Sequence, residues 1–269
     1  MTKVITVSNQ KGGVAKTTTS LNFAVELGNR GYKVLLIDFD TQGNLSRASG
    51  AFKGENIDLL EDTIATSIND LINDNDFGLY IYKTGNKNVE IIPCNISMAQ
   101  TKMMLSLALA RESMMKKIVE RIKRFDSFDY IIIDSAPSLD IDLINCFVAS
   151  DEVLITATPD TFSLSGTKAL IDSINKVKNN LNSNLKIAGV LVTQVDRRTN
   201  FAKDMVYTLR GIWGNEIDIY NTEIPISVKI KESQAVGMAI SEYEKNNKVA
   251  VAYSSFTDEY LNKSREAKM

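Results

Sequence analysis

The sequence predicts a doubly wound α/β fold, in which a mostly parallel sheet carries helices on both faces. Short, β-branched apolar runs alternate with longer helix-like segments along the chain. Continuous apolar strands are typical of a parallel sheet, because helices bury both of its faces. The 269 residues suffice for one large domain, and no linker interrupts them. We therefore expect a single domain over residues 1–269.

Six runs are expected as strands: KVITVS (3–8), KVLLIDF (33–39), VEIIP (89–93), DYIIID (129–134), EVLITAT (152–158) and IAGVLVTQV (187–195). Residues 51–88 are rich in Asn, Asp and Gly and predict a surface excursion with a short helix. Residues 98–125 predict a methionine-rich helix in the core or at a subunit contact. Residues 258–269 predict the end of a last helix. Ligands of such sheets bind at the carboxyl ends of the strands.

Composition excludes several classes of chemistry. The chain has no histidine, which removes the usual general base and the commonest metal ligand. Cys94 and Cys146 lack CxxC spacing, so we expect two buried small side chains without redox or metal chemistry. No apolar run approaches the roughly 20 residues that span a bilayer, and no signal peptide precedes the first strand, so we expect a cytoplasmic protein without integral membrane association.

A net charge of -2 argues against a globally basic nucleic-acid binder, although a local basic patch remains open.

The segment VSNQKGGVAKTTTSL (7–21) predicts a phosphate-binding loop. The common pattern is G-x-x-x-x-G-K-[ST], in which backbone N–H groups surround phosphate, the lysine binds β/γ oxygens and the hydroxyl binds Mg²⁺. Alignment on Lys16 and Thr17 places Gln10 and Ala15 where that pattern has glycines. A strand that ends at Ser8, a Gly12-Gly13 turn and a helix starting near Lys16 still provide the physical requirements. Ala15 fits only if its backbone avoids positive φ.

The stretch KGGVAKTT resembles the deviant Walker A signature, KGGxxK[ST], of the ParA/MinD superfamily of P-loop ATPases. The resemblance implies ATP and Mg²⁺ as cofactors and an ATP-dependent homodimer. It also implies that Lys11 reaches across the dimer interface to the phosphates bound by the partner subunit. The residues expected to bind nucleotide are Gly12, Gly13, Val14, Ala15, Lys16, Thr17, Thr18 and Pro225.

Three carboxylates complete the expected catalytic site. Asp38 and Asp40 end the second strand on the same side of an extended chain. By resemblance, Asp40 orients the attacking water and Asp38 supports the metal and water network. Asp134 follows four apolar residues as a Walker B aspartate does, and would hold Mg²⁺ through water, with Thr17 and Asp38 as the other residues of the metal site. Ser135 to Asp140 resembles the second switch loop, with Ala136 where a proline is common.

The resemblance to ParA continues over nearly the whole chain. It includes GVLVTQVDRRTNFAKDMVYTLR, with Asp196 and Thr199 in its turn, and TEIPISVKIKESQAVGMAISEY, where Ile226 replaces a commonly basic residue. ParA proteins segregate plasmids or chromosomes, and their ATP-bound dimers coat DNA until a ParB-type partner stimulates hydrolysis. We expect weak basal ATPase activity, nucleoid association with ATP, and non-specific DNA binding through phosphate contacts. The candidate cations are Arg197, Arg198, Lys203, Arg210, Lys229 and Lys231.

The N-terminal helix-turn-helix extension of the longer ParA type does not precede the first strand, so no operator-specific repression is expected.

Four other interpretations of the function stay open. A MinD-like regulator would need an amphipathic C-terminal helix, for which FTDEYLNKSREAKM has little apolar surface. A positioner of other cargo would share the ATPase cycle, an iron–sulfur electron carrier would need paired cysteines, and a non-enzymatic scaffold would bind nucleotide without turnover.

Overall fold

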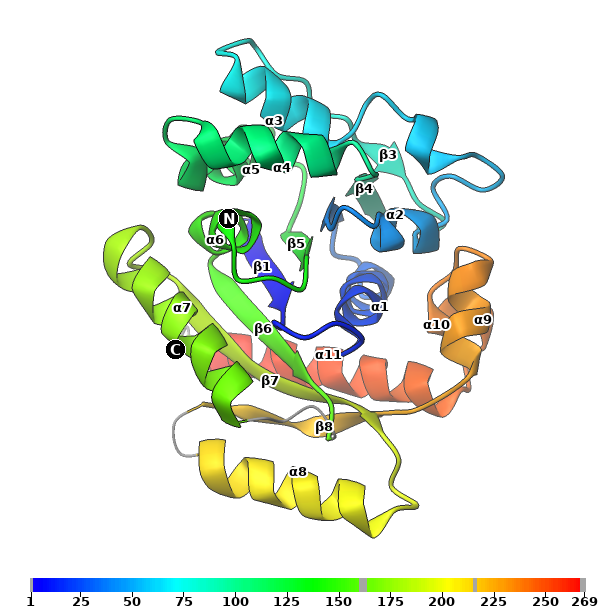
Figure 1. Cartoon of the computed structure of the whole chain (residues 1–269). Coiled ribbons are helices and arrows are strands. Elements are labelled where there is room, and N and C mark those ends of the chain that lie inside the picture. The colour runs from blue at the N-terminus through cyan, green and yellow to red at the C-terminus, as the bar shows by residue number, and fades with distance from the viewer. Residues whose placement is uncertain (1, 160–163, 215–216, 267–269) are drawn as a thin grey trace.

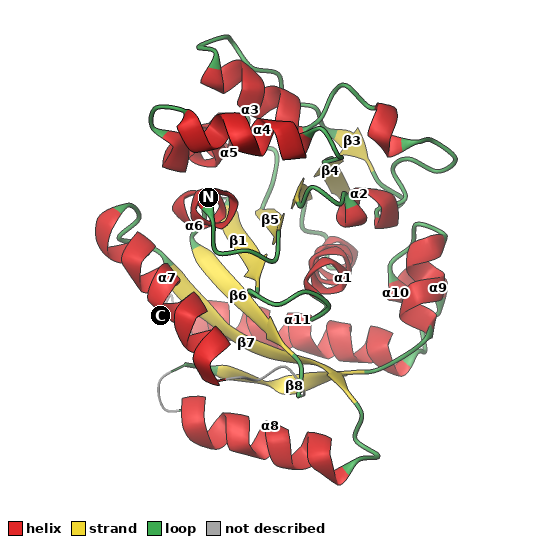
Figure 2. Ribbon diagram, in the orientation of Figure 1, coloured by secondary structure: helices red, strands yellow, loops and turns green. Residues whose placement is uncertain are grey.

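The computed structural model describes residues 2–159, 164–214 and 217–266. Within these residues the strands form one eight-stranded sheet in the order β3-β4-β2-β5-β1-β6-β7-β8 (Figures 1 and 2). Neighbouring strands are parallel, except that β3 is antiparallel to β4. The strands are β1 (Lys3–Ser8), β2 (Val34–Phe39), β3 (Tyr82–Lys83), β4 (Val89–Ile92), β5 (Tyr130–Ser135), β6 (Glu152–Ala157), β7 (Lys186–Val195) and β8 (Ile219–Pro225).

Helices connect the parallel strands. They are α1 (Lys16–Asn29), α2 (Asn44–Ala48), α3 (Ile64–Ile72), α4 (Met98–Leu107), α5 (Met114–Arg124), α6 (Ile141–Ala149), α7 (Leu164–Asn180), α8 (Asn200–Trp213), α9 (Lys229–Ala235), α10 (Ile240–Tyr243) and α11 (Lys248–Glu266). Two 3₁₀ turns, η1 (Ile57–Leu59) and η2 (Arg111–Ser113), lie between helices. The result is the predicted doubly wound fold.

Alternate residues of each strand reach opposite faces of the sheet. On β1, Ile5 and Val7 pack in a cluster with α1 and α11, whereas Val4 packs in a cluster with α3, α4, α5 and α6. On β6, Leu154 faces the first cluster, while Val153 and Ile155 pack with α6, α7 and α8. This burial on both faces explains why the central strands are continuous apolar runs.

All six expected strands are confirmed to within about one residue at each end. The analysis of the sequence missed β3, which has two residues, and β8. Polar Asn221, Thr222 and Glu223 interrupt the apolar pattern of β8, and β8 lies at the edge of the sheet where such residues reach solvent.

Two segments differ from expectation. The excursion 51–88 is not confined to the surface, because Ile64, Ala65 and Ile68 of α3 are fully buried in the core. The methionine-rich stretch is not one helix: α4 ends at Leu107, and Ala110 has a φ of 51° before α5 begins. The expected last helix is confirmed as α11, and residues 267–269 lie outside the described part.

The segment around α9 and α10 packs against α1 and α2 through its backbone. The N–H of Ile240 donates to Asn22 Oδ1 (2.8 Å). A Cβ built on Gly50 would lie 2.3 Å from the carbonyl oxygen of Gly237, and both glycines have positive φ. A side chain at either position would push these two turns apart.

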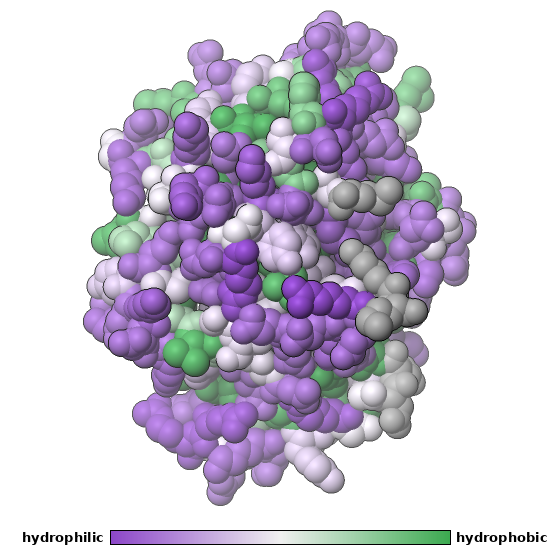
Figure 3. Space-filling view, turned by 180° about the vertical axis from the view of Figure 1, so that it is seen from behind, coloured by the Kyte–Doolittle hydropathy of each residue, from purple (hydrophilic) through white to green (hydrophobic). Residues whose placement is uncertain are grey.

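Hydrophilic residues cover most of the face opposite to that of Figure 1, with hydrophobic residues scattered among them (Figure 3). No helix in the described part of the chain is long and apolar enough to cross a bilayer. Both cysteines are buried and unpaired, which agrees with the expected packing role.

Candidate functional site

The loop between β1 and α1 is built on left-handed backbone. Gly13 has a φ of 78° and Ala15, the residue before α1, has a φ of 61°. The expectation that Ala15 avoids positive φ is therefore wrong. The chain must turn sharply into α1, and alanine carries the smallest side chain after glycine, so it enters this region at a cost of about 1–2 kcal/mol.

Backbone N–H groups in this loop lack protein acceptors. None of the residues from Gly12 to Thr17 donates its backbone N–H to an acceptor among the described residues. Buried or clustered N–H groups are nearly always paired, and a run of such groups at a helix N-terminus binds anions. The loop therefore has the chemistry of a phosphate site.

Side chains from neighbouring strands hold the loop in this shape. Asn9 Nδ2 donates to the carbonyl of Thr156 (2.6 Å), and Asn9 Oδ1 accepts from the N–H of Lys11 (2.9 Å). From β7, Gln194 Nε2 donates to the Gly13 carbonyl (2.7 Å). The loop is thus fixed to β6 and β7 before any ligand binds.

Lys16 is buried at the start of α1, with 7% of its surface exposed. Its Nζ donates to the carbonyl of Lys11 (3.1 Å). Burial lowers the pKa of Lys16, and the nearby carboxylates of Asp134 and Asp40 oppose that shift. An ammonium that loses hydration in this way gains most from a polyanionic ligand.

Thr17 and Asp134 meet at the carboxyl end of β5. Thr17 Oγ1 donates to Asp134 Oδ2 (2.7 Å), and Ser20 Oγ donates to Asp134 Oδ1 (2.9 Å). Burial raises the pKa of Asp134 to about 6, although the two hydroxyls and Lys16 favour its charged form. A hydroxyl beside a buried carboxylate supplies the oxygen ligands that Mg²⁺ prefers, and the cation would compensate the buried charge.

Asp38 lies beside Asp134 in the register of β2 and β5. Its Oδ2 accepts from the N–H (2.8 Å) and Oγ (2.7 Å) of Ser46, and its Oδ1 accepts from the N–H of Asp40 (3.2 Å). Burial, and secondarily the charge of Asp134, raises the pKa of Asp38 to about 7. Since protein donors already contact both oxygens, Asp38 orients its neighbours.

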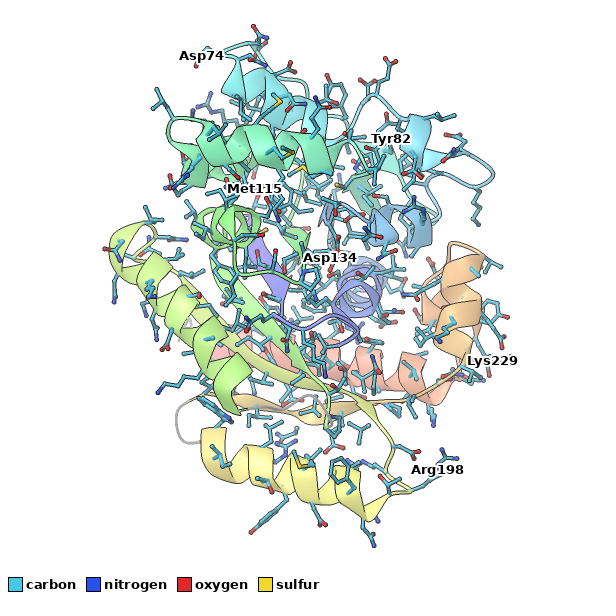
Figure 4. All side chains as sticks on the ribbon, viewed as in Figure 1. Asp74, Tyr82, Met115, Asp134, Arg198 and Lys229 are labelled. Carbon is cyan, nitrogen blue, oxygen red and sulfur yellow. The ribbon has the colours of Figure 1, made fainter. Side chains whose placement is uncertain are left out.

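Asp40 occupies a different environment from Asp38. It is partly exposed, lines the central cleft, and accepts the N–H of Gln42 (3.0 Å) on Oδ1. Figure 4 shows Asp134 at the centre of the molecule, beside the start of α1. The structure therefore brings Lys16, Thr17, Asp40 and Asp134 to one end of the sheet.

The cleft has a volume of about 950 Å³. The phosphate loop lines one side of the cleft, and Asp40 and Arg47 line another. Pro225, the last residue of β8, also lines the cleft. Of the eight residues expected to bind nucleotide, Val14 alone is absent from the lining, because its side chain is buried. Lining residues that the sequence did not indicate include Gln194, Gln234 and Tyr253, which carry no recognisable motif.

Lys11 is exposed beside the cleft. No acceptor or carboxylate among the described residues contacts its ammonium group, although its backbone carbonyl accepts from Lys16. The ammonium group of Lys11 therefore faces solvent.

The loop after β5 is fixed at its far end. Lys102 of α4 pairs with Asp140 (2.6 Å) and with buried Asp142 (2.7 Å) at the start of α6. Ser138 Oγ donates to Asp140 Oδ1 (2.7 Å), and Pro137 lines the cleft. This loop therefore connects the cleft with α4, and no sequence motif indicates the role of Lys102.

All the candidate DNA-binding cations except Lys231 lie outside the cleft lining, and Figure 4 shows Arg198 and Lys229 at the periphery of the molecule. Arg197 pairs with Glu223 (2.9 Å), Arg198 with Asp196 (2.7 Å) and Lys229 with Glu232 (2.7 Å). Arg210 donates to the carbonyl of Tyr220 (2.9 Å). Lys203 is exposed on α8, and Lys231 lines the cleft. Carboxylates of the same chain thus neutralise several of these cations.

Comparison with known proteins agrees with this geometry. The family model described as "AAA domain" matches residues 2–187. The chain is 34% identical over 259 residues to the sporulation initiation inhibitor protein Soj of Bacillus subtilis, covering 96% of this chain and 98% of Soj. It is 34% identical over 262 residues to the chromosome-partitioning ATPase Soj of Treponema pallidum, covering 97% and 98%.

A solved structure of similar fold is cobyrinic acid a,c-diamide synthase from Mycobacterium smegmatis with bound ADP and magnesium. It superposes with a TM-score of 0.82 at 28% identity, covering 99% of this chain and 97% of that chain. The septum site-determining protein MinD from Pyrococcus horikoshii, complexed with Mg-ADP, superposes with a TM-score of 0.71 at 23% identity and shares the fold, with 96% of each chain covered.

Proposed function

The chain belongs to the ParA/MinD family of P-loop ATPases, and on this premise we propose that it is a DNA-partition ATPase. In this proposal it binds ATP and Mg²⁺, dimerises, coats duplex DNA without sequence preference, and is released when a ParB-type partner stimulates hydrolysis. The observation that carries the proposal is the run of unpaired backbone N–H groups from Gly12 to Thr17, set between buried Lys16 and the carboxylates of β2 and β5.

The roles of the residues follow from their environments. Lys16 and the loop N–H groups bind the phosphates, and their fixed dipoles stabilise charge that develops during phosphoryl transfer. Thr17 and Asp134 would hold Mg²⁺, and the cation would neutralise phosphate charge when bound. Asp40 is the partly exposed carboxylate of the site, so it can accept a hydrogen bond from an attacking water. Asp38 holds Asp40 and Ser46 in place.

We assign Lys11 a role at the interface of the proposed dimer. Its exposed ammonium would contact phosphate bound by the partner subunit, so that ATP binding and dimerisation reinforce each other. Basal hydrolysis is expected to be weak, because no group of the site is a strong base and the half-exposed Asp40 holds water loosely in a single subunit.

The membrane alternative finds little support in α11. Its apolar residues Val249, Tyr253, Phe256 and Tyr260 are buried against the sheet and α1. That helix would have to leave the core before it could lie on a membrane. A cargo-positioning ATPase that acts on a protein scaffold remains the alternative that the following experiment separates from DNA partition.

The test is a low-salt mobility-shift assay on non-specific duplex DNA with ATP and Mg²⁺, with ADP, or without nucleotide. Wild type is compared with Lys11→Ala and with Lys87→Ala, a matched exposed lysine outside the site. We expect a shift with ATP only, retained by Lys87→Ala and lost by Lys11→Ala. The absence of a shift under every condition would refute DNA coating and favour a protein scaffold.

A further inference from the structure

Gln194 has an unusual backbone for its position. It lies next to the end of β7, and it is the one non-glycine residue with positive φ inside a strand of the described part (φ of 55°). Gly, Asn and Asp tolerate this region, whereas glutamine enters it at a cost in stability. Strain of this kind persists where surrounding contacts impose it, and it often marks a functional position.

The side chain of Gln194 has a specific contact. It lines the cleft, and its Nε2 donates to the carbonyl oxygen of Gly13 at 2.7 Å. The preceding Thr193 Oγ1 lies 3.2 Å from the carbonyl oxygens of both Val14 and Ala157, which share its single hydroxyl proton. Two consecutive carbonyls of the phosphate loop are therefore bonded to the end of β7.

These two hydrogen bonds also determine which way the N–H groups of the same peptide units point. A trans peptide is planar, so its C=O and N–H point to opposite sides. When the Gly13 carbonyl faces Gln194, the N–H of Val14 faces away from β7, and the bond from Thr193 does the same for the N–H of Ala15. Neither of these N–H groups has an acceptor among the described residues.

We propose that Gln194 is a positioning residue for nucleotide binding. Its amide fixes the Gly13 carbonyl, which keeps the N–H groups of Val14 and Ala15 oriented toward phosphate, and the strained backbone is what brings the amide into reach. The inference rests on the proposed phosphate site. It assigns to β7 a role in nucleotide binding that the sequence of the phosphate loop does not indicate.

Two variants separate positioning from a merely structural role. Gln194→Gly removes the amide and relieves the positive φ, so the urea midpoint should rise while affinity for a non-hydrolysable ATP analogue with Mg²⁺ falls about 5–10-fold. Gln194→Asn tolerates the same backbone but is one methylene shorter, so it should lose affinity similarly. A residue that only stabilised the loop would lower stability and affinity together when it is replaced. A gain in stability with a loss of affinity is therefore specific to the positioning role.

A third variant adds a pH readout. Gln194→Glu places a carboxylate against the Gly13 carbonyl at pH 8, which is repulsive, whereas the protonated acid can donate. With an ordinary glutamate pKa near 4.3, its affinity relative to wild type should be lowest at pH 8 and should recover as the pH falls toward 4, where about two-thirds of such a glutamate is protonated. A constant ratio across this range would contradict the proposed bond.

Lys16→Ala distinguishes failure of this inference from failure of the proposed function. If Lys16→Ala abolishes binding of the ATP analogue while all three Gln194 variants bind as wild type does, the phosphate site stands and the positioning role is overturned. If Lys16→Ala and the Gln194 variants all bind as wild type does, the site itself is wrong and both proposals fall.

Discussion

The phosphate-loop end of the sheet and the basic periphery treat charge in opposite ways. At the first, Lys16, Asp38 and Asp134 are buried within one hydrogen-bonded arrangement, and burial shifts the pKa of each away from its ordinary value. At the second, cations such as Arg197 and Arg198 lie at the surface and pair with neighbouring carboxylates. Contacts within the chain set the charge states at the phosphate-loop end. The effect of the basic periphery depends instead on which charged ligand approaches it.

This difference teaches where substitutions should matter. Removal of a charge at the phosphate-loop end changes the stability of the site or its chemistry and has a large effect. Removal of an exposed, screened charge has a small effect, which becomes visible only when a polyanion is present and falls with added salt.

The largest expected effect comes from Asp40→Ala. Loss of the exposed carboxylate should lower ATP turnover at least about 10²-fold, since the attacking water loses its acceptor, while ATP affinity stays within a few-fold. Phosphate release under saturating ATP measures it. Asp196→Ala, in the basic periphery, is the matched control and should retain turnover; normal turnover in Asp40→Ala would remove the assigned role.

The second prediction concerns pH. Burial raises the pKa of Asp134 from 3.8 to about 6, so the folded state holds this proton more tightly than the unfolded state. The associated stability is complete below about pH 4 and is lost as the pH rises through 6. In metal-free protein, Asp134→Asn should therefore be more stable than wild type at pH 8, by about 1–3 kcal/mol.

Urea unfolding at pH 4 and pH 8 measures this effect. The hydroxyls of Thr17 and Ser20 can rotate to suit the amide, so packing should survive. The two proteins should converge toward pH 4, and Asp134→Asn should lose Mg²⁺-dependent turnover. An equal stability difference at both pH values would contradict the raised pKa of Asp134. It would also weaken the distinction between the phosphate-loop end and the basic periphery.

The third prediction sharpens the description of the basic periphery. Lys203 is exposed without a carboxylate partner among the described residues, whereas Arg197 is bound to Glu223. Lys203→Ala should weaken DNA binding in the presence of ATP about 2–5-fold and reduce the slope of log Kd against log salt by about 1. Arg197→Ala should change both less. Equal losses would mean that intramolecular pairing does not decide which cations reach DNA.

The smallest expected effect is that of Ala15→Gly. Glycine enters positive φ freely, so this substitution should raise the unfolding free energy by about 0.5–1 kcal/mol. Ala110→Gly relieves a similar φ of 51° outside the site and should give a similar gain. Only Ala15→Gly should also alter ATP affinity. Stability that is unchanged in both would show that neither backbone is strained.

The central strands, the phosphate loop and the carboxylates near it were predictable from the sequence because their signals are local. Each buried strand is a contiguous apolar run, and the loop, Asp40 and Asp134 lie directly after such runs. Asp38 and Asp134 come together through the register of β2 and β5, a strand pairing that the sequence did not specify.

Other features depend on contacts between distant segments. The φ of Ala15 is imposed by the entry into α1, and Gln194 contacts Gly13 across 181 positions. The pairing of Arg197 with Glu223 requires β8, an edge strand whose polar residues hide its period. Residue types along the chain carry no signal for such contacts.

The central place of β1 in the sheet has a consequence for biosynthesis. β1 leaves the ribosome before its neighbours β5 and β6, which end at Ser135 and Ala157. At ordinary elongation rates, β1 waits on the order of 10 s with both edges unpaired. The emerging chain is thus exposed to chaperones and to misassociation during this interval, and it cannot hold nucleotide until β5 and β6 have been translated.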